Sequence, residues 1–389
     1  MFQTVPQKAI RCVFMRGGTS KALMFRHEDL PAEREDWTAI FLAAMGSPDQ
    51  FERQLDGMGG GISSLSKVCI IAPASCPDAD VDFTFCQVSP RDASVDYAGN
   101  CGNMTSAVGP FAVDEGLVGP AVDGPMMVRI HNTNTNKIVH AHFMVSQGRA
   151  DIDGDMHIDG VSGTGSPIRL DFLDPGGART SGVLPTGNAV DPIEVHGEAL
   201  VEASLVDASN PCVFVRAADF GLSGAETPDD IEQDTLLLAR LEKIRQAASV
   251  RMGMTRDLSD AARQASQPKI ALLTAPVAAP LLSGQDLQAA DHDIACRMIS
   301  MGRPHRAIPI TGALCLAAAC RISGTIASES VSAPEGNEIR IGHPSGITLV
   351  GAEISQTRAG IKVERATVYR TARRLFQGEV LYRTRVPAA

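Results

Sequence analysis

An ordered internal repeat constrains the fold of this chain more than any other feature of its sequence. Three strand-like segments of the first half recur in the second half in the same order, about 200 residues later each time. The matched pairs are Cys12–Arg16 with Cys212–Arg216, Ser66–Ile71 with Pro268–Leu273, and Val128–Asn132 with Ile339–His343. A repeat of this length predicts two similar halves rather than a short-period solenoid.

Each half also contains an outer amphipathic helix and a buried helix. We expect the outer helices over 31–45 and 228–248, because both segments begin with acidic residues and then carry apolar residues at helical spacing. The buried helices are expected after Asn100 and over 311–319, where nearly every residue is apolar or small. Apolar runs predict strands at 12–16, 67–72, 81–88 and 269–274.

This order of elements predicts an α/β (α+β) chain of two pseudo-symmetric domains, each wrapping strands around its buried helix. A length of 389 residues is also too great for one ordinary core. A turn-rich stretch at 184–187 predicts domains 1–185 and 186–389, with the final segment able to pack back on the first domain. A ligand site is expected in the cleft where the buried helices begin.

Composition argues against several classes of partner. The net charge is -10 and no basic run is interleaved with aromatic residues, so nucleic acid is not an expected partner. The apolar stretches contain Pro or Gly and are too short to span a membrane. Nine cysteines without metal-type spacing, in a chain without a secretory pattern, predict a cytoplasmic location. The oligomeric state stays open, a homodimer or higher homo-oligomer included.

The stretch Tyr97–Gly109 carries the strongest candidate for chemistry, a cysteine between glycines and asparagines. We expect Asn100 to cap the buried helix and Gly102 to let the backbone approach a ligand, with Asn103 next to it. The first turn of a helix offers free N–H groups that bind a carboxylate and stabilise a thiolate. Cys101 is therefore a candidate acid, base or nucleophile, although a small buried cysteine at an ordinary helix start gives the same pattern.

Two further loops of the first half supply polar groups. The turn after the first strand offers a guanidinium, two glycines for close backbone approach and two hydroxyls, which suits a carboxylate. The glycine-serine loop 56–66 leads into a strand that begins at Lys67, and partial burial there makes a lysine usable as a base. A surface turn and a solvated lysine are the open alternatives. The candidate substrate-binding residues of these loops are Arg16, Gly17, Gly18, Thr19, Ser20, Ser64 and Ser66.

The second half offers fewer candidates. Arg303 and His305 precede the second buried helix and either add positive charge to the cleft or form an ordinary polar loop. Ser345 lies in a turn. Either its hydroxyl contributes to the ligand site, or the segment is only a turn. No nucleotide or metal site is expected, because the loop 56–67 lacks the order of a phosphate loop and the acidic segment 151–160 lacks a terminal glutamate.

Motifs spread over nearly the whole chain resemble the PrpF-type isomerase family. They are Met15–Lys21, Ser66–Val68, Asn100–Asn103, Leu184–Asn188, His343–Gly346 and Arg370–Arg373. The family includes methylaconitate and methylitaconate isomerases and 4-oxalomesaconate tautomerases. The resemblance points first to the tautomerases, which act in the bacterial breakdown of gallate and protocatechuate, aromatic compounds derived from lignin.

The resemblance implies the diaminopimelate epimerase-like fold, in which each of two halves is a strand cage around a central helix. In the epimerases a cysteine from each half faces the substrate. Cys101 matches the first cysteine, whereas the second match falls near Thr311 and Gly312, which carry no thiol, and Cys315 should face the core. The resemblance therefore implies the isomerase branch, in which the residue matching Lys67 is the main acid/base and the cysteine assists.

The sequence thus predicts a 1,3-allylic isomerase or tautomerase that needs no metal or organic cofactor and acts on a small unsaturated polycarboxylate. The first expectation for the substrate is 4-oxalomesaconate, and the alternatives are 2-methylaconitate and methylitaconate. An amino-acid epimerase or racemase, and a non-catalytic accessory protein of an aconitase-like enzyme, stay open as other functions.

Overall fold

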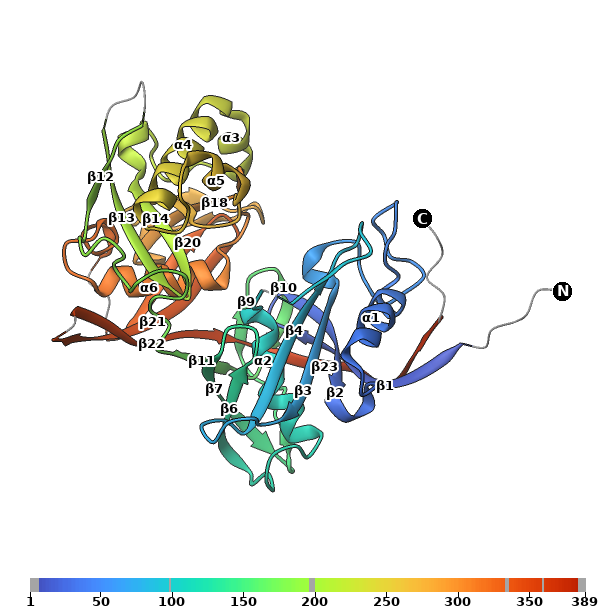
Figure 1. The fold of residues 1–389 in the computed structure, drawn as a ribbon. Coiled ribbons are helices and arrows are strands. Elements are labelled where there is room, and N and C mark those ends of the chain that lie inside the picture. The colour runs from blue at the N-terminus through green and yellow to red at the C-terminus, as the bar shows by residue number, and fades with distance from the viewer. Residues whose placement is uncertain (1–6, 98, 196–199, 333–335, 359, 384–389) are drawn as a thin grey trace. The chain divides into compact units, whose positions relative to one another are not determined.

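The computed structural model describes residues 7–383 apart from 98, 196–199, 333–335 and 359, and it divides into two compact units (Figure 1). Unit 1 comprises Met1–Leu170 and Tyr369–Ala389, and unit 2 comprises Asp171–Val368. Of the described helices, none is both long and apolar enough to cross a membrane.

This division differs from the expected one at 185/186. Residues 171–185 belong to unit 2, where the Asp207 carboxylate accepts hydrogen bonds from the backbone N–H groups of Arg179 and Thr180, at 2.7 and 2.9 Å. The turn-rich composition at 184–187 therefore marks a loop inside a unit. The last strand, by contrast, belongs to unit 1.

Unit 1 is built from strands around one helix, with a second helix outside. Its helices are α1 (Trp37–Met45) and α2 (Gly102–Asp114). Its strands are β1 (Lys8–Gly17), β2 (Ser20–Arg26), β3 (Lys67–Pro73), β4 (Val81–Val88), β5 (Val95–Asp96), β6 (Gly124–Asn132), β7 (Lys137–Ser146), β8 (Arg149–Ala150), β9 (Met156–Ile158), β10 (Val161–Gly165) and β23 (Ala372–Tyr382), and β11 (Ile168–Leu173) leads into unit 2.

The helix α2 lies in the centre of unit 1. Every residue from Met104 to Val113 is buried, and the helix contacts β1 to β4, β6 and β7. On the other side of the strands, α1 places Trp37, Ile40 and Phe41 in a core with residues of β1, β2 and β3. The strands β2 and β3 are therefore buried on both faces, which explains their nearly continuous apolar sequences.

Unit 2 repeats this plan with additional short helices. Its helices are α3 (Pro228–Gln233), α4 (Thr235–Arg251), α5 (Leu258–Arg263), α6 (Ile310–Arg321) and α7 (Ile326–Ser330). Its strands are β12 (Asp191–Ile193), β13 (Val201–Ala208), β14 (Asn210–Arg216), β15 (Lys269–Thr274), β16 (Ala279–Pro280), β17 (Asp286–Leu287), β18 (Ile294–Ser300), β19 (Arg303–Pro304), β20 (Glu338–His343), β21 (Gly346–Thr357) and β22 (Gly360–Arg370), which runs into unit 1.

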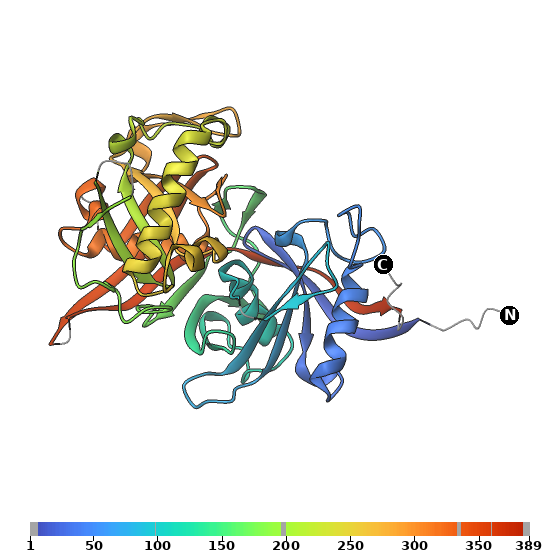
Figure 2. The ribbon, with the colours of Figure 1, turned by 45° about the horizontal axis from the view of Figure 1, so that its top comes forward.

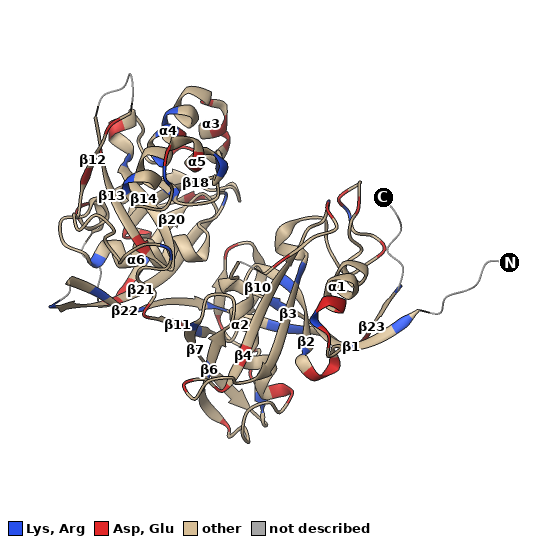
Figure 3. Ribbon diagram, viewed as in Figure 1, with Lys and Arg blue, Asp and Glu red and all other residues tan. Residues whose placement is uncertain are grey.

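The helices of unit 2 take the same places as those of unit 1. Figure 2 shows α4 along one face of the strands, where Leu241, Ile244 and Ala248 pack against β13, β14 and β15. Acidic and basic residues are interspersed over α3, α4 and α5, as expected of an outer layer (Figure 3). The helix α6 is the buried one, because all its residues from Gly312 to Cys320 are buried.

The expected outer helices are shorter than predicted. In unit 1 the helix begins at Trp37 rather than near 31, after a short 3-10 turn at Arg34–Asp36. In unit 2 the segment 228–248 forms two helices, because the Asp234 side chain accepts a hydrogen bond from the N–H of Leu237 at 2.9 Å and starts a new helix. The predicted strands 67–72, 81–88 and 269–274 are confirmed within one residue.

The pairing of the strands establishes the internal repeat. In unit 1 the successive pairs β1–β2, β2–β3, β3–β4, β4–β6 and β6–β7 are antiparallel, parallel, antiparallel, parallel and antiparallel. In unit 2 the pairs β13–β14, β14–β15, β15–β18, β18–β20 and β20–β21 follow the same series. Each unit also contains an ion pair at the same place, in which the Nε and a terminal nitrogen of an arginine donate to an aspartate carboxylate. These pairs are Arg129 with Asp80 and Arg340 with Asp293.

One of the three repeat matches made from sequence is wrong by one strand. Cys212 pairs in parallel with Lys269, and the residue that pairs in the same way with Lys67 is Ala22. The counterpart of Cys212–Arg216 is therefore Ala22–Arg26 rather than Cys12–Arg16. Both β1 and β2 contain a buried apolar run followed by an arginine, so only the pairing partner tells them apart.

Candidate active site

Lys67 begins β3 and is almost completely buried, with 7% of its surface exposed. Its Nζ donates a hydrogen bond to Oε1 of Gln87, on the neighbouring strand β4, at 2.5 Å. The Gln87 amide is held in turn, because its Nε2 donates to the carbonyl oxygens of Ser63 and Ser66 at 3.0 and 2.9 Å. Lys67 has no ion pair with any described carboxylate. Gln87 therefore orients the amine without placing a negative charge beside it.

The glycine-rich loop before Lys67 is a scaffold built around Gln54. This fully buried side chain donates to the hydroxyls of Ser47 and Ser66 at 2.8 and 2.7 Å and accepts from the N–H of Gly61 at 2.9 Å. The expectation that Ser66 contacts the substrate is therefore corrected, because its side chain is buried and hydrogen-bonded to Gln54. Ser64 is half-buried in a 3-10 turn.

Cys101 occupies the N-cap position of α2 and is partly exposed. Its carbonyl oxygen accepts hydrogen bonds from both the N–H and the hydroxyl of Thr105, at 3.0 Å each. The thiol thus lies at the helix start, where the N–H groups of Gly102 and Asn103 have no partner within the helix. The expectation that Asn100 is the N-cap is wrong, since its Oδ1 accepts a hydrogen bond from Asn132 instead, at 2.8 Å.

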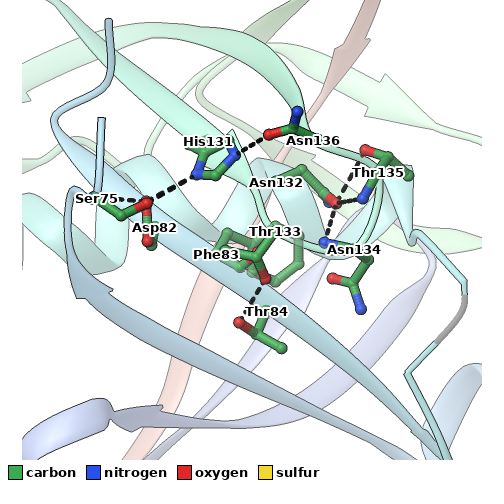
Figure 4. Close-up of polar contacts among 10 residues, drawn as sticks. All are labelled: Ser75, Asp82, Phe83, Thr84, His131, Asn132, Thr133, Asn134, Thr135 and Asn136. Atoms are coloured by element: carbon green, nitrogen blue, oxygen red, sulfur yellow. Dashed lines mark hydrogen bonds and ion pairs between the residues drawn. The ribbon is translucent and has the colours of Figure 1, made fainter. Parts of the chain in front are cut away.

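The sequence did not single out the turn between β6 and β7, whose polar side chains are shown in Figure 4 and which is hydrogen-bonded to the segment before Cys101. The Oδ1 of Asn132 accepts from the N–H groups of Asn134 and Thr135, at 3.1 and 3.0 Å. The Asn134 amide donates to the carbonyl oxygens of Phe85 and Tyr97, at 2.9 and 2.6 Å. The alternating Asn and Thr residues at 132–136 are the signal that could have identified this turn.

The turn at Arg16–Ser20 packs directly on the first turn of α2. A Cβ on Gly17 would lie 2.6 Å from the Asn103 carbonyl oxygen, and one on Gly18, whose φ is +49, would lie 2.1 Å from the Asn103 Oδ1. The Asn103 amide also donates to the Thr19 hydroxyl at 3.0 Å. The structure therefore brings these two predicted loops together, and close approach requires both glycines. Ser20 is buried and pairs with Gly17.

Two arginines flank this contact, and the side-chain hydrogen bonds described for them go to uncharged oxygen atoms. Arg16 donates to the Gly18 and Thr371 carbonyl oxygens at 3.0 Å each and to the Thr371 hydroxyl at 2.9 Å. Arg370 is 8% exposed and donates to Asn103 Oδ1 at 3.3 Å, and burial lowers its pKa to about 10. It stays charged at neutral pH. Arg370 belongs to the motif Arg370–Arg373 but is not among the site residues expected from the sequence.

Both candidate catalytic residues affect the pKa of the buried Cys69 on β3. Burial raises the pKa of its thiol, Cys101 raises it further, and Lys67 opposes that rise. Both Lys67 and Cys101 therefore lie within electrostatic range of one side chain. An amine, a thiol at a helix start and two arginines form an environment that favours an anion.

The predicted residues of unit 2 have mixed roles. Arg303 is exposed beside Glu232, with 3.6 Å between Nε and Oε1, and the Ser345 hydroxyl donates to the Arg306 carbonyl oxygen at 2.7 Å. These two contacts are those of an ordinary polar loop. Gly312 packs against Met298, and Thr311 is half-buried beside it in the first turn of α6.

The position that matches Cys101 in unit 2 is occupied by proline. Pro309 is the N-cap of α6, and its carbonyl oxygen accepts from the N–H of Ala313 at 2.9 Å, as that of Cys101 does from Thr105. The second-half match is thus two residues before the expected Thr311. Cys315 is fully buried and its Sγ donates to the Val206 carbonyl oxygen at 3.4 Å, so it faces the core as expected.

Comparison with known proteins agrees with this geometry. The PrpF protein family model matches residues 7–383. The chain belongs to the PrpF family. It is 44% identical to the 3-methylitaconate isomerase of Eubacterium barkeri, with 96% of this chain and 97% of the relative covered.

Other PrpF relatives are isomerases as well. The 2-methyl-aconitate isomerase of Shewanella oneidensis is 38% identical and covers 96% of this chain and 97% of its own length. The 4-oxalomesaconate tautomerase of Pseudomonas putida is 39% identical, with 96% of each chain covered.

Superposition on solved structures identifies the fold. A crystal structure of methylitaconate-delta-isomerase superposes with a TM-score of 0.89 at 41% identity, covering 97% of this chain and 96% of that one. A probable proline racemase from Agrobacterium radiobacter superposes with a TM-score of 0.51 at 12% identity, covering 95% and 92%, which is a likeness of fold alone. The chain therefore has the diaminopimelate epimerase-like fold.

Proposed function

We propose that this PrpF protein is an allylic isomerase that moves a C=C bond in an unsaturated, branched di- or tricarboxylate of the methylitaconate and 2-methylaconitate class. The observation that carries the proposal is the buried Lys67 amine, which Gln87 holds and which has no ion pair with a carboxylate among the described residues. Lys67 and the thiol at the start of α2 both affect the pKa of Cys69. The names of the relatives support the substrate class.

In the proposed reaction Lys67, in its neutral form, removes a proton from the carbon that lies between the double bond and a carboxyl or carbonyl group. The electron pair delocalises over the conjugated system as a dienolate, and the N–H groups at the start of α2 stabilise its charge. Reprotonation at the far end of the allylic system, by Lys67 or Cys101, moves the double bond. The proton count is unchanged overall.

Arg16 and Arg370 fit the remaining requirement, which is to hold the carboxylates of such a substrate. Both guanidinium groups use only part of their five N–H donors on neutral oxygen atoms. An amino-acid epimerase of this fold would need a second acid/base at the start of α6, and Pro309 offers none.

The substrate expected first from the sequence, 4-oxalomesaconate, becomes the second candidate. The 44% identical relative and the superposed crystal structure both carry the name of a methylitaconate isomerase, and these favour a methyl-substituted substrate. 4-Oxalomesaconate stays a candidate substrate, because a 4-oxalomesaconate tautomerase is 39% identical to this chain.

A panel assay tests the proposal. The purified chain is mixed separately with 3-methylitaconate, 2-methylaconitate and 4-oxalomesaconate, and each mixture is followed by ultraviolet absorbance and proton NMR. We expect a methyl-substituted acid to give the highest kcat/KM. Preference for 4-oxalomesaconate would overturn the substrate class, and inertness toward all three would overturn the proposed function.

A further inference from the structure

The internal repeat places a second lysine, Lys269, at the position of unit 2 that corresponds to Lys67 in unit 1. Each lysine is the first residue of its strand, and that strand pairs in parallel with the strand before it. The antiparallel neighbour of Lys67 is Gln87 on β4, and the register of β15 with β18 places Ser300 opposite Lys269 in the same way. The side-chain contact is repeated as well, because Lys269 Nζ donates to the Ser300 hydroxyl at 2.9 Å.

Among the described residues, no carboxylate forms an ion pair with Lys269. Desolvation by burial lowers the pKa of this lysine. An ammonium group removed from water without a counter-ion is costly, so a ligand carboxylate at this position would be stabilising.

His305 supplies a buried ring nitrogen without a hydrogen-bond partner in electrostatic range of this lysine. Burial, together with the charge of Lys269, lowers the pKa of His305 to about 4, so the ring is neutral at physiological pH. Its backbone N–H donates to the Met298 carbonyl oxygen at 2.8 Å, but its Nε2 is buried without a hydrogen-bond partner. A buried ring nitrogen left unpaired calls for a ligand or a water molecule.

The buried helix of unit 2 begins next to these groups. Gly312, in the first turn of α6, approaches Met298 so closely that a Cβ would lie 2.5 Å from the sulfur. Met298 is the residue whose carbonyl oxygen accepts from His305. The first turn of α6 and the backbone of His305 thus both contact Met298.

We propose that Lys269, Ser300 and His305 form a carboxylate-binding site of unit 2. One ammonium group, one hydroxyl and, in the tautomer with its proton on Nε2, one neutral imidazole match the single charge and several acceptor positions of a carboxylate. Pro309 at the start of α6 provides no thiol. Unit 2 therefore binds the carboxylate but has no cysteine there to transfer a proton. The choice of a carboxylate as the ligand rests on the proposed function.

Tricarballylate tests the site, because this saturated tricarboxylate cannot isomerise. Its binding to the full chain is measured by calorimetry, and the His305 ring signals are followed by NMR. We expect tricarballylate to shift the His305 signals of the wild-type protein, and Lys269→Met to weaken its binding about ten- to hundred-fold. Ser300→Ala, which removes only the hydroxyl, should weaken it less, and the exposed Lys243→Met serves as the matched control.

Two results would overturn this site: absence of tricarballylate binding to the wild-type chain, or unchanged binding and unmoved His305 signals in Lys269→Met. Thermal unfolding shows whether each variant is folded. If Lys269→Met does not fold, the binding of tricarballylate to Ser300→Ala tests the site instead. Failure of the proposed function gives a different result, since the unsaturated acids would then remain unconverted while tricarballylate still binds in a Lys269-dependent way.

Discussion

Gln87 shows how a single neutral side chain prepares a lysine for proton transfer. Its Oε1 holds the Lys67 amine, and its own amide is fixed by two backbone carbonyl oxygens. An amide orients the amine without adding a negative charge, whereas a carboxylate at the same place would favour the charged amine. Gln87 is therefore a positioning residue for the proposed base.

Gln87→Glu should impair the isomerisation through charge rather than through shape. A carboxylate next to Lys67 keeps the amine protonated, so the rise of kcat/KM with pH should move to higher pH. The pH profile of the variant measures this shift. Gln87→Met, which removes the hydrogen bond without adding charge, is the matched control and should lower kcat while leaving the profile in place. Superimposable profiles for Gln87→Glu and the wild type would exclude the proposed role.

His305 makes a prediction about acid stability. Its folded pKa of about 4 lies below the ordinary 6.5, because burial and Lys269 disfavour the charged ring. Below pH 6.5 the unfolded chain therefore binds a proton that the folded chain does not, and stability from this residue is lost as the pH falls through about 4. Urea unfolding between pH 8 and 4 should show a shallower loss for His305→Gln, and NMR titration of a ring near 6.5 would contradict the account.

At the scale of elements, the site depends on the contact between the Arg16–Ser20 turn and α2. The two glycines allow the turn to approach Asn103, and Asn103 connects it to Thr19 and Arg370. The turn between β6 and β7 fixes the other side, through Asn132 and Asn100. The start of α2 is thereby held from two directions before any substrate binds.

Gly18→Ala should destabilise unit 1 and slow the isomerisation together. The new Cβ would meet Asn103 Oδ1 at 2.1 Å at a φ of +49, so strain and overpacking should cost about 3 kcal/mol. Gly148→Ala is the control, because Gly148 has a φ of +72 with no atom within 4 Å of the new Cβ, and it should cost about 1 kcal/mol. Urea unfolding measures both values. Equal decreases in the free energy of unfolding would mean that the contact with Asn103 does not contribute to stability.

At the scale of the whole molecule, the repeat and the two buried helices could be predicted from sequence because they depend on long apolar segments. The start of β3 at Lys67 was predictable for the same reason. Gln87 was missed because a polar residue gains its meaning from strand pairing, which local sequence does not contain. Lys269 was aligned with Lys67 by the repeat and Arg370 was placed in a motif, but neither was expected at a site for the same reason. The wrong match of Cys12 with Cys212 has the same origin. Ser66 was misjudged because its partner Gln54 comes from a distant part of the loop.

Proton exchange in heavy water tests the central claim most directly, which is that Lys67 removes the proton. Wild-type protein and Lys67→Ala are incubated in D2O with 3-methylitaconate, or with the best substrate of the panel, and deuterium incorporation is followed by proton NMR. The exposed Lys8→Ala is the control and should behave as the wild type. We predict that Lys67→Ala, folded as judged by circular dichroism, incorporates no deuterium above the uncatalysed rate, whereas exchange at the wild-type rate in this variant would contradict the mechanism.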